Sequence, residues 1–291
     1  MNTLCFDIGG TYIKYGVINT YGQIINFGKF PTPKNSCRDT IPNKLIDYSK
    51  KILNSYNIQK IGISTAGQVD AELGKIIYTN DNLPDYTGCN LAEKIQSKID
   101  IETYVENDVY CAALGEMYQG AAINSKNFIC LTLGTGVGGA FILNQRLYKG
   151  SNNSAVIAGY IPVNNSCFDK IVSTQGILEN YKTLTNKEIN GIELFQKIRD
   201  SEKEAVIVYE NFINNIVEVL LNITYMFDPE LIVIGGGISS QGEMLFDDIN
   251  TSFQEKALPI HSKLKIVKAH LENTAGLIGA YYITKNRNYY Y

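Results

Sequence analysis

Apolar residues along the chain fall into short runs separated by polar or glycine-rich turns, and two of these turns have the same form. The first is Gly9-Gly10-Thr11 and the second is Gly134-Thr135-Gly136, and each lies between two apolar runs. Such a pattern predicts a β-hairpin, because glycine reaches φ values that a residue with a Cβ disfavours. Two such hairpins more than a hundred residues apart indicate a duplicated half.

A glycine turn of this kind leaves backbone N–H groups bare, and a nest of N–H groups attracts phosphate oxygens. We therefore predict that both turns bind phosphate. Asp7 precedes the first turn. Its carboxylate could hold Mg²⁺ through water, since hard cations prefer oxygen ligands. It could equally close the Gly9-Gly10 turn by hydrogen bonds, and both roles can hold together.

The remaining hydrophobic periodicity predicts strands that alternate with helices, which is typical of an α/β protein. The expected strands are a three-strand meander over 4–30 and shorter runs at 61–64, 103–105, 128–142, 231–234 and 265–267. The expected helices cover 41–56, 91–99, 109–118, 202–227, 245–258 and 275–284. Residues 65–70 and the polar stretch 150–176 are expected to be loops.

Two further segments follow predicted strands, where ligands gather in α/β sheets. At the first, Asp108 can accept a proton from a substrate hydroxyl and Asn107 can hold that hydroxyl. The alternative is that Asp108 only caps the following helix. At the second, Gly235-Gly236-Gly237 would let a purine ring or ribose approach the backbone, or would form a crowded strand-to-helix turn.

Composition narrows the function classes. The chain has 291 residues and a net charge of −3, with no basic block, so we expect no binding to nucleic acid. No apolar run is expected to reach membrane-spanning length, and no signal peptide precedes the first strand, which predicts a cytoplasmic protein that binds no membrane. The six cysteines are scattered and form no Cys-x-x-Cys pair, so no disulfide framework or zinc knuckle is indicated.

Taken together, these motifs resemble the ROK family of sugar kinases, within the actin-like ATPase and hexokinase superfamily. The resemblance covers nearly the whole chain, and six motifs occur in the family's order. They are Asp7-Ile8-Gly9-Gly10-Thr11 with Lys14, Ala66-Gly67-Gln68-Val69-Asp70 with Asn82-Leu83-Pro84, Glu106-Asn107-Asp108 with Ala112 and Glu116, Leu133 to Gly139, Ile234 to Ile238, and Asn273 to Ala280.

The resemblance implies two actin-like, ribonuclease H-like α/β domains, with mixed sheets flanked by helices and an active-site cleft between them. The domains would be residues 1–112 and 113–274, with a closing helix at 275–291 that packs back onto the first. The family also implies ATP and Mg²⁺ as cofactors, a sugar as the small-molecule partner, and a homodimer.

The same resemblance assigns site residues. Asp108 would be the general base that removes the proton of a hexose 6-hydroxyl, and Asp7 would contact the Mg²⁺ that ATP brings. The sugar side would comprise Gly67, Asn82, Asn107, Asp108, Glu179 and Tyr160, and the nucleotide side Asp7, Gly9, Gly10, Thr11, Lys14, Gly134, Thr135, Gly136, Gly236 and Gly237.

One stretch departs from the family pattern. Many members carry a Gly-Glu-x-Gly-His segment and a Cys-x-Cys-Gly…Cys-Leu-Glu cluster that binds structural zinc. Here Ile157 stands where a sugar-binding Glu is expected and Tyr160 where a His is expected, and of the acidic pair only Glu179 remains. Because Cys167 alone cannot build the tetrahedral sulfur site that zinc prefers, we predict no structural zinc.

Some bacterial N-acetylmannosamine kinases of this family similarly lack zinc. N-acetyl-D-mannosamine, phosphorylated to its 6-phosphate in sialic acid catabolism, is therefore the first predicted substrate, and glucose or a β-glucoside is the alternative. A hypothesis of another class is a catalytically silent sugar sensor or transcription repressor. Repressors of the family carry an added N-terminal DNA-binding domain, whereas this chain begins at its first strand and has no basic face.

Overall fold

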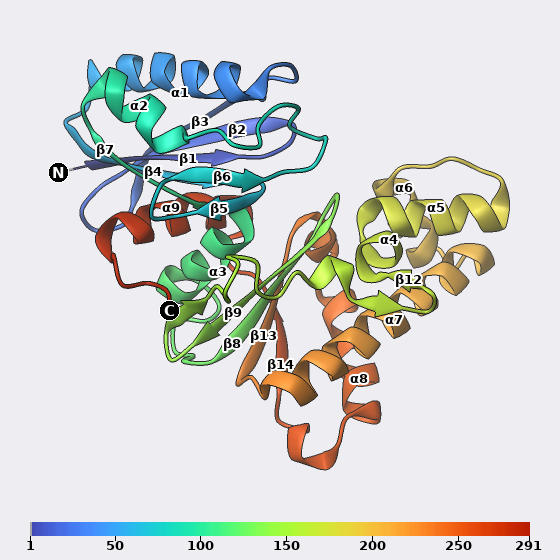
Figure 1. Ribbon diagram of the computed structural model, residues 1–291. Coiled ribbons are helices and arrows are strands. Elements are labelled where there is room, and N and C mark those ends of the chain that lie inside the picture. The colour runs from blue at the N-terminus through green and yellow to red at the C-terminus, as the bar shows by residue number, and fades with distance from the viewer. Residues whose placement is uncertain (1) are drawn as a thin grey trace. The chain divides into compact units, whose positions relative to one another are not determined.

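The computed structural model describes residues 2–291 and divides the chain into two compact units (Figure 1). The first unit contains residues 2–123, 145–155 and 273–291, and the second contains 124–144 and 156–272. The elements of the first unit are β1 (Asn2–Ile8), β2 (Tyr12–Ile18), β3 (Ile24–Pro31), α1 (Cys37–Leu53), β4 (Ile58–Thr65), β5 (Gln68–Asp70), β6 (Lys75–Tyr78), α2 (Leu91–Ile99), β7 (Glu102–Asn107), α3 (Asp108–Gln119), β10 (Arg146–Tyr148) and α9 (Ala275–Lys285).

The sheet of the first unit has the strand order β3-β2-β1-β4-β7. β1 pairs with β2 antiparallel, whereas β4 runs parallel to both β1 and β7. In the register of these strands Asp7 lies opposite Ser64, and Thr65 lies opposite Asn107. The carboxyl ends of β1, β4 and β7 therefore meet at one edge of the sheet, where α/β proteins place their ligands.

Helices α3 and α9 pack closely in this unit, because each carries a glycine at the contact. The helices approach so closely there that a side chain would have no space. A Cβ on Gly279 would lie 1.8 Å from the carbonyl oxygen of Cys111, and one on Gly115 would lie 2.5 Å from that of Ala275. This packing keeps the whole of α3 in the first unit. The predicted boundary after residue 112 falls inside that helix, and residues 145–155, expected in the second domain, also belong to the first unit.

The second unit carries β8 (Phe128–Leu133), β9 (Val137–Leu143), β13 (Leu231–Gly235) and β14 (Lys265–Lys268) in the order β9-β8-β13-β14. β8 and β9 form an antiparallel hairpin, and β13 is parallel to β8 and to β14. Its other elements are η1 (Ala158–Tyr160), β11 (Pro162–Val163), β12 (Ser166–Cys167), α4 (Phe168–Val172), α5 (Thr174–Thr185), α6 (Gly191–Arg199), α7 (Lys203–Phe227), η2 (Gly237–Gln241), α8 (Glu243–Lys256) and η3 (Pro259–His261), and the short helix η4 (Glu272–Thr274) lies at the boundary. Both sheets are thus mixed and accompanied by helices, as predicted.

Helix α7 corrects one expectation. By length and composition its 25 residues would suffice to cross a membrane, although no run of that kind was expected. Phe212, Ile216 and Leu220 of this helix are buried in the hydrophobic core of the second unit, and half of the apolar stretch is buried. The core helix of a globular protein meets the same two criteria.

Three further expectations about secondary structure were incomplete. Residues 68–70 form β5 rather than a loop, and the stretch 150–176 contains η1, β11, β12 and α4. Helix α1 begins at Cys37 and contains Pro42. That proline removes the N–H that would bond to the carbonyl of Arg38, and Lys94 Nζ donates to this carbonyl instead, at 2.9 Å.

Candidate active-site residues in the two units

The Gly9-Gly10-Thr11 turn connects β1 to β2 and is closed by its own backbone. The N–H of Gly9 donates to the carbonyl of Tyr12 at 3.2 Å, and the hydroxyl of Thr32 donates to the carbonyl of Gly9 at 2.7 Å. A Cβ on Gly10 would meet no atom within 4 Å, so the backbone there is open to a ligand. Lys34 Nζ also donates to the carbonyl of Gly10, which adds a positive charge beside the turn.

The structural reason for the glycines differs from the one predicted. Gly9, Gly10, Gly134 and Gly136 all have negative φ, so none of them is needed for a left-handed backbone. A Cβ would find space at Gly10 and Gly134, whereas one on Gly9 or Gly136 would lie 3.2 or 3.0 Å from an oxygen atom. Glycine at Gly10 and Gly134 therefore leaves room for a ligand, and glycine at Gly9 and Gly136 avoids a close contact.

Asp7 is the penultimate residue of β1, beside this turn. Its Oδ1 accepts from the hydroxyl of Ser64 at 2.7 Å, and its Oδ2 is 3.3 Å from Lys14 Nζ. Lys14 donates also to the carbonyl of Asn273, at 3.1 Å. Asp7 therefore does not close the Gly9-Gly10 turn by its hydrogen bonds. A carboxylate with a hydroxyl next to it is an oxygen donor set that suits Mg²⁺.

Asn107 and Asp108 lie where β7 becomes α3. The side-chain Oδ1 of Asn107 accepts from the N–H groups of Val109 at 2.9 Å and Tyr110 at 3.0 Å, which makes Asn107 the N-cap of the helix. Its Nδ2 donates to the carbonyl of Gly67 at 2.8 Å and to Oδ1 of Asp108 at 2.9 Å. Because both donors and both acceptor positions are used, a sugar hydroxyl would have to replace one of these partners.

Asn107, and not Asp108, is therefore the N-cap of α3, so the alternative that Asp108 only caps the helix does not hold. Among residues 2–291 its side-chain hydrogen bonds, from Asn107 Nδ2 and from the N–H of Val109, both reach Oδ1. Burial, together with the negative charge of Asp7, raises the pKa of Asp108 to about 7, although hydrogen bonds to the carboxylate act in the opposite direction. A carboxyl group with a pKa near neutrality is suited to general acid–base catalysis.

The other residues predicted for the sugar side of the first unit differ in their surroundings. Gly67 has φ of 103°, and a Cβ there would lie 2.7 Å from the carbonyl oxygen of Tyr78, so this position requires glycine. Through its carbonyl it contacts Asn107 directly. Asn82 lies in an exposed loop, and its backbone N–H donates to Oδ1 of Asn80 at 3.2 Å.

In the second unit, the Gly134-Thr135-Gly136 turn connects β8 to β9. The N–H of Gly134 donates to the carbonyl of Gly136 at 3.0 Å, and Thr135 and Gly136 are exposed. Asp169 of α4 supports the turn, because its Oδ1 accepts from the N–H of Val137 at 2.6 Å. A Cβ on Gly136 would lie 3.0 Å from that same oxygen. Asp169 was not among the predicted site residues, since it lies more than thirty residues from the turn in the sequence.

The glycines after β13 divide between the two interpretations given above. Gly236 has φ of 88°, and a Cβ there would lie 2.4 Å from the carbonyl oxygen of Leu133, so it forms a crowded turn. Gly237 has no atom within 4 Å of the position of a Cβ, so its backbone is open to a ligand. The crowded contact joins the end of β13 to the end of β8, where the second turn begins.

Tyr160 and Glu179 are both exposed. Val156 and Ile157 occupy the Gly-Glu positions of the family pattern. Val156 keeps a left-handed backbone with φ of 57°, which a β-branched residue disfavours and glycine adopts freely. Across the same residues no group of three or more His, Cys, Asp or Glu side chains could hold a metal ion. The absence of structural zinc stays a prediction for metal analysis.

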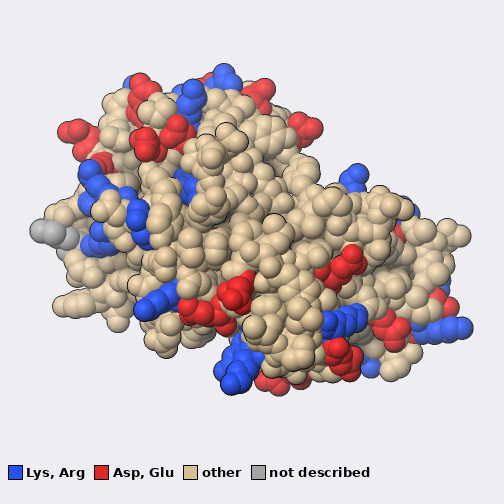
Figure 2. All heavy atoms as spheres, turned by 60° about the horizontal axis from the view of Figure 1, so that its bottom comes forward, with Lys and Arg blue, Asp and Glu red and all other residues tan. Residues whose placement is uncertain are grey.

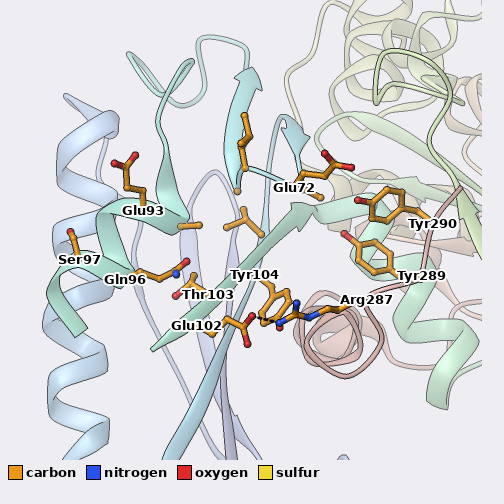
Figure 3. A pocket seen from close by; sticks show the side chains of 15 residues that line it. Glu72, Glu93, Gln96, Ser97, Glu102, Thr103, Tyr104, Arg287, Tyr289 and Tyr290 are labelled. Atoms are coloured by element: carbon orange, nitrogen blue, oxygen red, sulfur yellow. Dashed lines mark hydrogen bonds and ion pairs between the residues drawn. The ribbon is translucent and has the colours of Figure 1, made fainter. Parts of the chain in front are cut away.

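Cavities and surface charge do not single out the predicted site. A cavity of about 640 Å³ in the first unit is lined by residues 71–74, by α2 and the start of β7, and by 287–290 (Figure 3). None of the predicted site residues lines it. On the face shown in Figure 2, Lys and Arg side chains occur next to Asp and Glu side chains.

Comparison with known proteins tests the resemblance. The model of the ROK family matches residues 3–287. The chain belongs to the ROK family. An uncharacterized protein of Clostridium perfringens is 34% identical to it over 280 residues, which are 95% of either chain. A glucokinase of Halalkalibacterium halodurans is 28% identical, over 97% of this chain and 94% of its own, and a β-glucoside kinase of Listeria monocytogenes is 28% identical, over 97% of each.

Solved structures of the ROK family share the fold. A Listeria monocytogenes protein described as a candidate N-acetylmannosamine kinase superimposes with a TM-score of 0.88 at 28% identity, over 99% of this chain and 100% of its own. A ROK glucokinase from Streptomyces griseus, solved with glucose and AMPPNP, superimposes with a TM-score of 0.83 at 26% identity. The match covers 96% of this chain and 98% of the glucokinase. The predicted family and the predicted actin-like α/β fold are therefore confirmed.

Proposed function

We propose that this ROK protein is an ATP-dependent sugar kinase that transfers the γ-phosphate of ATP to the 6-hydroxyl of a hexose. The observation that carries the proposal is the placement of Asp108. This carboxyl group lies at the carboxyl edge of a sheet whose next strands carry Thr65 and Asp7 at their ends, Asp7 being one residue before the end of β1, and its pKa is raised to about 7. The sugar kinases among its relatives match nearly its full length, which supports the same activity.

In this proposal Asp108 accepts the proton of the sugar hydroxyl as that hydroxyl attacks phosphorus. Asn107 keeps the carboxylate in place by donating to its Oδ1 and, through the carbonyl of Gly67, fixes the loop after β4. Asp7, held by Ser64 and Lys14, would hold Mg²⁺, which neutralises charge on the transferred phosphate when it is bound. The backbone N–H groups of Gly10, Thr11, Thr135 and Gly136 would orient phosphate oxygens, while those of Gly9 and Gly134 close the two turns.

For the sugar we propose N-acetyl-D-mannosamine. Support comes from the departures at Ile157 and Tyr160, which replace the usual Glu and His, and from the Listeria monocytogenes structure described as a candidate N-acetylmannosamine kinase. Gly67, Asn82, Tyr160 and Glu179 would contact the sugar, and Gly236 and Gly237 would lie near the adenosine. A second candidate is a β-glucoside or glucose, because a β-glucoside kinase and several glucokinases are relatives of similar identity.

The test is ADP release by the purified protein with ATP, Mg²⁺ and one sugar at a time. N-acetylmannosamine, N-acetylglucosamine, glucose and a β-glucoside form the panel, and mass spectrometry locates the phosphate on the product. We expect the highest kcat/KM with N-acetylmannosamine. Preference for the β-glucoside would replace the substrate but keep the kinase, whereas no stimulation by any sugar would favour the silent sensor and contradict the proposal.

Three further expectations belong to this proposal: a cytoplasmic location, a homodimer and no structural zinc. Analytical ultracentrifugation tests the dimer, and metal analysis of the purified protein tests the zinc. One zinc per chain would show ligands beyond Cys167.

A further inference from the structure

Glu106, which directly precedes the Asn107-Asp108 pair, is fully buried in the first unit. Its Oε2 accepts from Lys149 Nζ at 2.7 Å and from the hydroxyl of Tyr289 at 2.9 Å. Its Oε1 accepts from the backbone N–H of Asn107 at 2.8 Å. Lys149 is buried as well, with 2% of its side chain exposed. A buried carboxylate is stable only when its oxygens are satisfied in this way.

The residues that satisfy Glu106 come from two distant parts of the chain. Lys149 follows β10, and Tyr289 belongs to the tyrosine segment (Tyr289–Tyr291). The segment pairs with β10 like an added strand. The N–H of Leu147 donates to the carbonyl of Tyr289 at 2.7 Å, and the N–H of Tyr291 donates to the carbonyl of Leu147 at 3.1 Å. These two bonds fix the ring of Tyr289 beside Glu106.

Two cations, one in β10 and one directly after it, contact rings of the tyrosine segment. Lys149 Nζ lies 4.9 Å from the ring centroid of Tyr290, and the guanidinium of Arg146 lies 4.3 Å from that of Tyr291. Figure 3 shows Tyr289 and Tyr290 side by side on one wall of the cavity beside β7. Burial and the charge of Glu106 raise the pKa of the Tyr289 hydroxyl, so this group stays protonated and donates.

We propose that Glu106, Lys149 and Tyr289 are positioning residues for the catalytic carboxylate, and that the tyrosine segment is therefore part of the active-site support. The connection consists of consecutive hydrogen bonds. Tyr289 and Lys149 fix the Glu106 carboxylate, Glu106 fixes the backbone N–H of Asn107, and Asn107 fixes Oδ1 of Asp108. The proposal rests on the proposed function for the role of Asp108 as general base.

Two simpler explanations account for only part of this arrangement. A contact that only anchored the tyrosine segment would need no carboxylate, because the backbone pairing with Leu147 already does so. A structural ion pair between Glu106 and Lys149 would account for Oε2 but not for the contact of Oε1 with the backbone N–H of Asn107. The Tyr289 hydroxyl adds a donor to the oxygen that Lys149 already occupies, while Oε1 stays directed at Asn107.

The decisive variant is Tyr289→Phe, which removes only the hydroxyl and leaves the buried ion pair in place. Tyr291→Phe is the matched control: it makes the same chemical change two residues away, in a side chain that is half exposed. Loss of Lys149 or Glu106 would leave an unpaired buried charge and could prevent folding. We expect Tyr289→Phe to lower kcat about tenfold with nearly unchanged KM for sugar and ATP, since small misplacement of a catalytic group is costly.

Hydrogen exchange measured by mass spectrometry gives a second readout that needs no enzymatic activity. In Tyr289→Phe, a peptide covering residues 105–112 should exchange faster than in wild type, while peptides from β1 and β4 should be unchanged. Tyr291→Phe should match wild type in both kcat and exchange.

The outcomes separate this proposal from the proposed function. If wild type phosphorylates no sugar, the proposed function fails, and a local exchange change at 105–112 still supports the connection to Asn107. If wild type is active and Tyr289→Phe equals the control in kcat and in exchange at 105–112, the positioning role is wrong. Faster exchange throughout the first unit, with kcat falling only as the folded fraction falls, would also contradict it, because the hydroxyl would then serve stability alone.

Discussion

The two glycine turns have nearly the same local sequence, but the structure supports them by different means. The first turn, Gly9-Gly10-Thr11, accepts hydrogen bonds from the hydroxyl of Thr32 and the ammonium group of Lys34, two residues that follow β3. The second, Gly134-Thr135-Gly136, is followed by the N–H of Val137, which donates to a carboxylate of a later helix, that of Asp169. Similar hairpins can thus be held by unrelated side chains, and the local pattern predicts the turn but not its support.

The turns differ also in the acid that accompanies them. Asp108 lies in the same unit as the first turn, and burial and Asp7 raise its pKa to about 7. Asp169, near the second turn, has its Oδ1 committed to a backbone N–H. We infer that the proton acceptor accompanies the first turn, and that the second turn orients phosphate without a proton acceptor of its own.

The largest effect should come from Asp108→Asn. The amide keeps the shape of the side chain but cannot accept the proton, so kcat should fall by about 10²–10⁴-fold, the usual contribution of a general base. Sugar binding, measured by calorimetry, should stay within about twofold of wild type because the contacts of Asn107 remain. A variant with near wild-type kcat would remove Asp108 from the mechanism.

The next effect concerns pH. Asp108 must be deprotonated to accept a proton, so kcat/KM should rise with pH through a midpoint of about 7 and level off above it. Below the midpoint the rate should fall about tenfold per pH unit. A rate profile that is flat from pH 5.5 to 8.5 would contradict the assignment.

A smaller effect is expected for Asp169→Ala. The N–H of Val137 loses its acceptor, and the second turn loses its support, which should raise the KM for ATP about tenfold, the equivalent of one hydrogen bond to a charged group. The KM for sugar should stay unchanged. Steady-state kinetics with each substrate varied in turn checks this, and a selective rise in the sugar KM would show that the second turn does not bind phosphate.

The smallest expected effect is on stability. The ordinary pKa of an aspartate is 3.8, whereas that of Asp108 in the folded protein is about 7. Between these values the folded state retains a proton that the unfolded chain has released, so the free energy of unfolding falls as pH rises through this window. Asp108→Asn avoids that loss.

The melting temperature of Asp108→Asn should therefore equal that of wild type near pH 4. At pH 8 it should exceed wild type by at least about 2–4 °C, the shift that each kcal/mol of stability produces in a protein of this size. Thermal denaturation of both proteins at the two pH values provides the comparison. A variant that is less stable than wild type at pH 8 would show that the folded protein stabilises the Asp108 carboxylate instead of disfavouring it.

The sequence predicted those features that depend on local patterns. The hairpins, the strand ends that carry Asp7 and Asn107, and the long apolar helix over 202–227 were all found close to their expected bounds. Helix α6 was missed although it begins with a capping box, in which Asn190 and Glu193 bond to each other's backbone N–H, and this pattern could have been recognised.

Other features could not be predicted because they depend on contacts between distant segments. Nothing near Glu106 in the sequence indicates that Lys149 and Tyr289 bond to it, since these residues follow 43 and 183 positions later. Asn107 caps α3 in place of Asp108 for a geometric reason. Asn107 has an extended backbone and directly precedes the first helical turn, whereas Asp108 is already part of the helix. The negative φ of Gly9 and Gly10 likewise required coordinates.

The most direct test of the central claim is a crystal structure of the protein with a non-hydrolysable ATP analogue, Mg²⁺ and the preferred sugar of the panel. The account predicts phosphate oxygens on the backbone N–H groups of the turns at residues 10–11 and 135–136, and the sugar 6-hydroxyl within hydrogen-bond distance of Asp108. A nucleotide bound away from both turns, or a 6-hydroxyl directed away from Asp108, would contradict it.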